Sequence, residues 1–144
     1  LARLSRMADK VVQRHGERLP ETLMPLHYTF RRLQSILLSH TAAQEAGLLS
    51  DLAASDLSGL HEPSRLDRAA EAARRELADG VDAVSDLDAL TQAYTPPVDA
   101  CPTFRGLYFG LSELDRETRL HRQFECDVLF PKVRALIARP SPAR

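Results

Sequence analysis

A histidine and a glutamate lie four residues apart near the end of this 144-residue chain, at His121 and Glu125. Side chains at positions i and i+4 of a helix point to the same side. Both residues fall on a stripe with the helical period of 3.6 residues, which consists of Phe104, Leu107, Leu111, Leu114, Thr118, His121, Glu125, Val128 and Lys132. Ionisable groups on a buried stripe cost on the order of several kcal/mol without a partner, and a metal ion is one such partner.

Histidines on two other apolar stripes enlarge this candidate site. His15 lies on the stripe of the first predicted helix and His40 on that of the second. If the three histidines lie at a similar depth, three imidazoles and the Glu125 carboxylate converge on one point. Such nitrogen and oxygen ligands suit a non-haem iron, with zinc or manganese as alternatives. The competing interpretation is that each histidine is an isolated core residue that bonds to a backbone carbonyl.

Four helical segments must position these side chains, at residues 2–19, 25–54, 64–94 and 103–138. Pro96 ends the third segment, because proline disfavours a helical conformation in the residue before it, and Pro131 predicts a bend in the fourth. Long helices with short connections predict an all-α fold, an antiparallel four-helix bundle in which metal ligands project inward. We expect one domain over residues 1–139 and a frayed tail at 140–144.

The composition argues against several classes of function. The 19 basic and 20 acidic residues nearly balance and form no basic block, so nucleic-acid binding has no electrostatic footprint. No apolar run approaches the roughly 20 residues that a membrane span requires. The two cysteines make no disulfide or zinc-ribbon framework. We therefore expect a cytoplasmic protein that binds neither nucleic acid nor membrane.

Beyond the His–Glu pair, the C-terminal region carries a longer pattern, formed by Pro96-Pro97, Cys101, Leu107-Tyr108, His121, Glu125 and Leu129-Phe130-Pro131. This pattern resembles the last helix of the hemerythrin-like (HHE) di-iron proteins that repair iron–sulfur clusters after nitrosative or oxidative damage. The segment from His15 to Glu21 is similar to the family's first ligand segment, and Leu38-Ser39-His40 is similar to the start of its second. The resemblance implies a hemerythrin-like fold with metal ligands at His15, His40, His121 and Glu125.

The chain departs from this family at positions that bear on the metal. Gln44 stands where the family has a carboxylate, and Leu77 stands where it has a histidine. Glu45 is five residues from His40, about 140° around the helix, so it cannot easily bind the same ion. A further family histidine lies in a region that is shortened here. His27 is the remaining candidate for that ligand, although it too lies about 140° off the stripe of the second helix.

These departures change the expected metal content. The family's di-iron site uses five histidines and two bridging carboxylates, and the resemblance implies that one bridge and one imidazole are lost here. We expect a mononuclear or incomplete di-iron site, or a site that holds no metal, with Gln44 able to hydrogen-bond a ligand. Cys101, near a helix N-terminus, is a candidate redox thiol, and the competing interpretation is a structural thiol.

The pattern is compatible with three functions, of which we prefer the first. The first is that of a non-haem iron protein related to the repair family, acting in iron handling or in the response to nitrosative and oxidative stress. Its partner would be oxygen, nitric oxide or a client protein. The second is a metal-free bundle that acts through protein contacts, which Gln44 and Leu77 favour. The third is a metal-dependent oxidative enzyme that acts on a small molecule at an open coordination position. A homodimer is compatible with all three.

Overall fold

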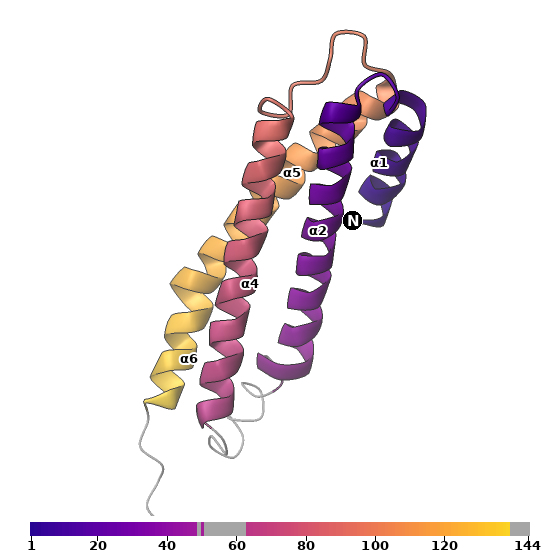
Figure 1. The fold of residues 1–144 in the computed structure, drawn as a ribbon. Coiled ribbons are helices and arrows are strands. Elements are labelled where there is room, and N and C mark those ends of the chain that lie inside the picture. The colour runs from indigo at the N-terminus through magenta and orange to yellow at the C-terminus, as the bar shows by residue number, and fades with distance from the viewer. Residues whose placement is uncertain (49, 51–62, 139–144) are drawn as a thin grey trace, which may run out of the picture.

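The computed structural model describes residues 1–48, 50 and 63–138, and every regular element among them is a helix (Figure 1). These elements are the α-helices α1 (Ala2–His15), α2 (Pro20–Ala43), α4 (Pro63–Leu90), α5 (Pro102–Phe124) and α6 (Phe130–Ile137), and the π-helices η1 (Gln44–Leu48) and η2 (Glu125–Leu129). The predicted all-α class is therefore confirmed. The predicted continuation of the second helix over residues 51–54 and the tail at 140–144 lie outside the described residues.

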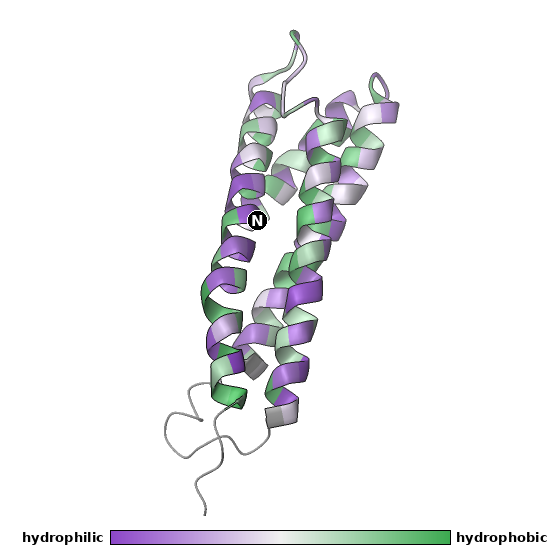
Figure 2. Ribbon diagram, turned by 90° about the vertical axis from the view of Figure 1, so that its left-hand side faces the viewer, coloured by the Kyte–Doolittle hydropathy of each residue, from purple (hydrophilic) through white to green (hydrophobic). Residues whose placement is uncertain are grey.

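The long helices run alongside one another, and α1 covers only one end of them (Figure 1). Helix α2 packs against α4, and α4 packs in turn against α5 and α6. The short α1 contacts α2 and α5. Polar and apolar segments alternate along the helices in Figure 2, as expected when one face of each helix is buried. None of the described helices combines the length and the apolar character needed to span a membrane.

Proline marks the start of several helices. The first helical residues of α2, α4 and α5 are Pro20, Pro63 and Pro102. At this position the missing N–H would have no intrahelical acceptor, and the fixed φ angle suits the helix. The prediction that the second helix starts near Pro25 is wrong. Its first turn is already closed by the N–H of Leu23, which donates to the carbonyl of Leu19 at 2.9 Å, and Pro25 lies inside the helix.

The third helix ends earlier than the sequence predicts. Helix α4 stops at Leu90 rather than at residue 94. The turn that follows is left-handed, with φ angles of 51°, 56° and 56° at Gln92, Ala93 and Tyr94, a region that is uncommon for residues other than glycine. The hydroxyl of Tyr94 anchors this turn, because it lies 3.0 Å from Oδ2 of Asp115 on α5.

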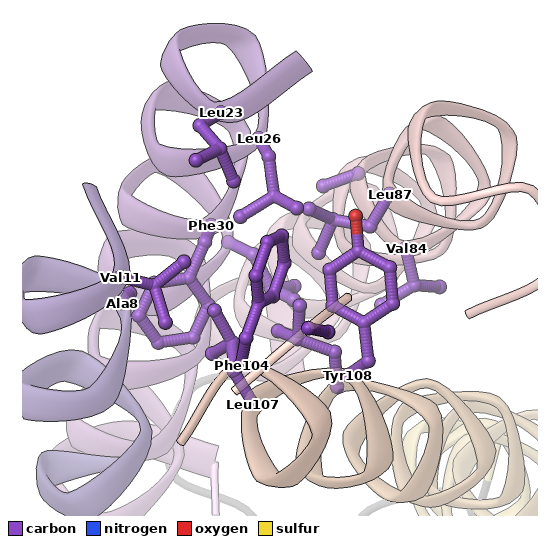
Figure 3. Packing of buried hydrophobic residues seen from close by; sticks show 14 residues of the cluster. Ala8, Val11, Leu23, Leu26, Phe30, Val84, Leu87, Phe104, Leu107 and Tyr108 are labelled. Atoms are coloured by element: carbon purple, nitrogen blue, oxygen red, sulfur yellow. The ribbon is translucent and has the colours of Figure 1, made fainter. Parts of the chain in front are cut away.

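Two apolar clusters fill the interior, one toward each end of the long helices. The cluster at the α1 end includes Phe30, Leu87, Phe104, Leu107 and Tyr108, from α2, α4 and α5 (Figure 3). The cluster at the α6 end is formed by Leu66, Ala70, Ala73, Leu77, Phe130 and Val133. Leu114 of α5 packs against the first cluster, and Leu129 of η2 packs against the second. The segment that carries His121 and Glu125 therefore lies between two apolar regions.

Two glycines of α5 allow α1 to approach closely. A Cβ atom on Gly106 would lie 2.8 Å from Cε of Met7, and a Cβ atom on Gly110 would meet Cδ2 of Leu4 at still closer range. Helix α1 therefore packs against α5 along these two residues. Its last residue, His15, consequently lies beside the start of α5.

Candidate metal centre

Three side chains from α2, α5 and η2 converge on one point. Nε2 of His40 lies 3.1 Å from Oε1 of Glu125. Nε2 of His121 lies 2.6 Å from the same oxygen and 3.3 Å from Nε2 of His40. Within the described part of the chain, these residues form a group whose potential ligand atoms all lie within 4.8 Å of one another. The structure thus brings together three of the four residues predicted as ligands.

The site is closed on one side and open on the other. The side chains of His40 and Glu125 are 3% and 2% exposed, whereas that of His121 is 49% exposed. Oε2 of Glu125 is buried and has no hydrogen-bond partner among the described residues. A buried carboxylate oxygen without a partner is costly. A cation bound at this oxygen would remove that cost.

Two buried ionisable groups stabilise each other's charged form here. Burial alone would raise the pKa of Glu125, but hydrogen bonds from His40 and Gln44 and the charges of His40 and His121 outweigh it and lower that pKa. Burial alone would likewise lower the pKa of His40, but the hydrogen bonds and charges of Glu125 and Glu76 outweigh it and raise that pKa. Both shifts therefore favour a carboxylate next to an imidazolium.

Both π-helices begin at this site. Gln44 opens η1 and Glu125 opens η2. The side-chain amide of Gln44 donates to Oε1 of Glu125 over 2.5 Å, so the residue predicted as a hydrogen-bonding neighbour contacts the carboxylate itself. A π-turn adds one residue to a helical turn and occurs frequently at functional sites. No feature of the sequence predicts these two turns.

Glu76, which the sequence analysis missed, completes the surroundings of His40. Its Oε2 lies 3.3 Å from Nδ1 of His40, and its Oε1 accepts a hydrogen bond of 3.2 Å from Oγ of Ser39. A carboxylate on Nδ1 fixes the ring and leaves Nε2 to face an ion. The sequence feature that could have revealed Glu76 is its spacing, because it comes three residues after buried Ala73 and so flanks the apolar stripe of α4.

His15 does not join this cluster, which corrects the prediction made from its stripe. Its Nε2 lies 3.4 Å from Sγ of Cys101, and its ring packs against Phe104 with centroids 5.5 Å apart. The reason is that His15 and His40 lie at different positions along the length of the helices. His40 lies twenty residues beyond Pro20, where α2 begins, and this is about 30 Å at 1.5 Å per residue. His15 is therefore paired with Cys101, the candidate redox thiol, at the other end of α2.

The remaining candidates also lie away from the cluster. Nε2 of His27 lies 2.8 Å from Oδ1 of Asp9 on α1, so this histidine joins two helices at the α1 end. Leu77, where the resemblance implies a histidine, is buried in the apolar cluster with Phe130. Glu45 is exposed, which agrees with its predicted offset around α2.

A single metal ion fits this donor set. Imidazole nitrogens and carboxylate oxygens bind zinc at about 2.0–2.2 Å, so neighbouring ligands of one ion stand roughly 3 Å apart. The three ligand atoms are separated by 2.6, 3.1 and 3.3 Å, close to that spacing. Two histidines and one carboxylate, with open positions left on the ion, are the ligands typical of mononuclear non-haem iron. The exposed edge of His121 gives solvent access to the site.

Comparison with known proteins finds related sequences. The chain is 31% identical to the iron–sulfur cluster repair protein ScdA of Staphylococcus haemolyticus over 132 residues, which cover 90% of this chain and 57% of that protein. It is 46% identical over 43 residues to the repair protein YtfE of Edwardsiella ictaluri, covering 30% of this chain and 20% of YtfE. It is 38% identical over 50 residues to a probable repair protein of Haemophilus influenzae, covering 35% and 22%.

The chain is thus similar in sequence to iron–sulfur cluster repair proteins, as the C-terminal pattern predicted. It spans 57% of ScdA and about a fifth of YtfE. No protein-family model and no solved structure matches the chain.

Proposed function

We propose that this chain is a hemerythrin-like, non-haem iron-binding protein with four antiparallel helices, which acts in iron–sulfur cluster repair or iron handling under nitrosative or oxidative stress. The observation that carries the proposal is the cluster of His40, His121 and Glu125, in which one buried carboxylate oxygen lacks a hydrogen-bond partner among the described residues. Similarity to ScdA and YtfE supports the functional context. The repair activity named for those proteins is extended to this chain as part of the proposal.

Each residue around the cluster has a role in this function. The side chains that would hold one iron ion are those of His40, His121 and Glu125. Glu76 orients His40 through Nδ1, and Gln44 holds Glu125 through Oε1. Iron bound by these residues would supply redox chemistry and could leave positions open to a further ligand. Because His121 is half exposed, a small diatomic molecule such as oxygen or nitric oxide can reach those positions from solvent.

Two observations favour a metal-free alternative. Gln44 is neutral where the related proteins are expected to have a bridging carboxylate, and it already donates to Oε1 of Glu125. Leu77 is apolar and buried at the position expected for a histidine. A protein with these residues can keep the fold and act through contacts with a client protein. An oxidative enzyme acting on a small molecule, by contrast, requires the same ion as the preferred function.

The test is the metal content of protein purified under reducing, chelator-free conditions and loaded anaerobically with ferrous iron. We expect about one iron per chain by elemental analysis, because the ligand set is that of a mononuclear site. Zinc and manganese are measured in the same samples as competing ions. His121→Ala and Glu125→Ala should each retain less than about a tenth of the wild-type iron, because each removes one ligand.

Glu45→Ala is the matched control, since Glu45 is an exposed carboxylate next to Gln44. Its iron content should equal that of the wild type, and circular dichroism should show that all variants fold. Equal iron content in all three variants would remove His121 and Glu125 from the site. A wild-type protein that binds no metal would favour the metal-free function.

A further inference from the structure

Cys101 and His15 form a pair of reactive groups away from the metal centre. Nε2 of His15 lies 3.4 Å from Sγ of Cys101, which is a free thiol. The pair joins the last residue of α1 to the residue that precedes α5, 86 positions further along the chain. A thiol within hydrogen-bond reach of an imidazole can pass its proton to that ring, and the resulting thiolate is the nucleophilic form of cysteine.

The start of α5 favours a negative charge on this sulfur. Cys101 is the N-cap residue of this 23-residue helix, and its side chain makes no capping hydrogen bond. The N-terminus of a helix carries a partial positive charge, which stabilises an anion placed there. The side chains of Cys101 and His15 are half-buried, so the pair is partly shielded from water and still within reach of a small reagent.

Neighbouring residues hold the two groups together. The guanidinium of Arg18 bonds the carboxylate of Asp99, which ties the turn after α1 to the segment before α5. The hydrogen bond and the charge of Arg18 lower the pKa of Asp99, and the charge of His15 adds a smaller effect in the same direction. Asp99 is therefore close enough to favour a proton on His15. The ring of His15 also packs against that of Phe104, with centroids 5.5 Å apart.

A hollow of about 390 Å³ adjoins the pair. Phe104, which packs on His15, forms part of its lining, together with Leu19 and Val98. Val98 is 97% exposed, so the hollow is accessible from solvent. A space of this size is within the range of sites that hold small molecules. A small reagent that approaches the sulfur therefore has room next to His15.

We propose that Cys101 is a nucleophilic thiol that exchanges with low-molecular-weight disulfides, and that His15 is the base that accepts its proton. The Cys101 thiolate attacks one sulfur of the disulfide and forms a new S–S bond. The original S–S bond breaks, and its electron pair leaves on the other sulfur, which takes the proton from His15. The products are a mixed disulfide at Cys101 and one free thiol, so the disulfide is the only oxidant consumed.

The reaction of the metal-free protein with oxidised glutathione tests this proposal. Mass spectrometry of peptides follows Cys101 and Cys126 separately in the same sample. Near neutral pH, His15→Gln should slow the modification of Cys101 at least about tenfold, because glutamine cannot accept the thiol proton. The modification of Cys126 should be unchanged. At about pH 10 the rates of the variant and the wild type should converge at Cys101, because a thiol ionises there without a base.

His27→Gln is the matched control, since His27 also lies at the α1 end but bonds Asp9. It should react like the wild type, and circular dichroism should show that both variants fold. A rate at Cys101 in His15→Gln equal to or above that of the wild type near neutral pH overturns the proposal. So does a slower rate that persists undiminished at about pH 10, because His15 would then act only through packing. Since the protein is tested without metal, such a failure leaves the proposed iron binding intact.

Discussion

Both ring nitrogens of His40 face carboxylates, Nδ1 toward Glu76 and Nε2 toward Glu125. A neutral imidazole has one N–H and can donate to only one of them. The ring therefore satisfies both as an imidazolium, or with a cation at Nε2 and a proton on Nδ1. Burial would lower the pKa of His40, but the two carboxylates raise it. The metal-free protein thus favours the imidazolium, and a metal ion bound here would take the place of its Nε2 proton.

Replacing Gln44 by glutamate tests whether one more carboxylate at the site strengthens iron binding. The Gln44 amide now donates to Oε1 of Glu125 over 2.5 Å. Without metal, Gln44→Glu should destabilise the protein by roughly 1–3 kcal/mol, because two buried carboxylates replace a hydrogen bond. With iron, the added ligand should raise affinity at least about tenfold. Urea unfolding measures the first effect, and competition with a chelator measures the second.

Gln44→Met is the control for this substitution, since it keeps the length of the side chain and removes the hydrogen bond without adding charge. It should bind no more iron than the wild type. An iron affinity of Gln44→Glu at or below the wild-type value would contradict the prediction. The new carboxylate would then lie outside the reach of the ion.

At the scale of the helices, the π-helix η2 changes which residues are buried. The stripe predicted from a constant period continues past Glu125 to Val128 and Lys132, yet Lys132 is exposed and Val133 is buried. A π-turn inserts one extra residue, so the buried positions move one residue along the chain. Periodicity predicted the burial of Glu125, which precedes the insertion, although His121 on the same stripe is 49% exposed. It failed afterwards because no residue type there marks a π-turn.

A glycine inside α4 offers a test of packing between elements. A Cβ atom on Gly80 would lie 3.7 Å from Cγ2 of Thr118 and 3.8 Å from Cγ2 of Ile36, which are ordinary contact distances. Alanine also favours the helix by about 1 kcal/mol over glycine. Gly80→Ala should therefore raise the free energy of unfolding by about 0.5–1 kcal/mol in urea titrations. A decrease would mean that α2, α4 and α5 pack more closely here.

Gly110→Ala provides the comparison within α5. It gains the same helix propensity, but its Cβ would overlap Cδ2 of Leu4 on α1. Its stability should therefore rise less than that of Gly80→Ala, or fall. Equal gains for the two variants would show that α1 moves away from α5 without cost.

For the whole molecule, the buried faces could be predicted from the sequence but their alignment in depth could not. Leu26, Phe30 and Leu33 repeat at helical spacing, and all three are 0% exposed. The position of His15 depends instead on how α1 is seated against α5 and on the turn into α2. Such contacts join residues far apart in the chain, and the periodicity within one helix does not predict them. This is why His40, His121 and Glu125 meet while His15 does not.

Because the cluster joins residues 85 positions apart, as in His40 and Glu125, the site exists only in the folded chain. An ion that binds there stabilises the fold by about 2.7 kcal/mol at a concentration of 100 times its Kd. For a chain of this length, the thermal midpoint should rise by about 5–10 °C. Circular dichroism melts with zinc, which avoids oxidation, measure this shift against metal-free protein.

The rise of the thermal midpoint with zinc should vanish in Glu125→Ala, because this variant lacks the carboxylate that faces both histidines. It should persist at full size in Gly80→Ala, although the metal-free midpoint of that variant is higher, because distant and independent effects on stability add. Together these variants separate binding at the cluster from general tightening of the helices. A rise of wild-type size in Glu125→Ala would show that the ion stabilises the protein from another place, and the cluster would then have no part in holding it.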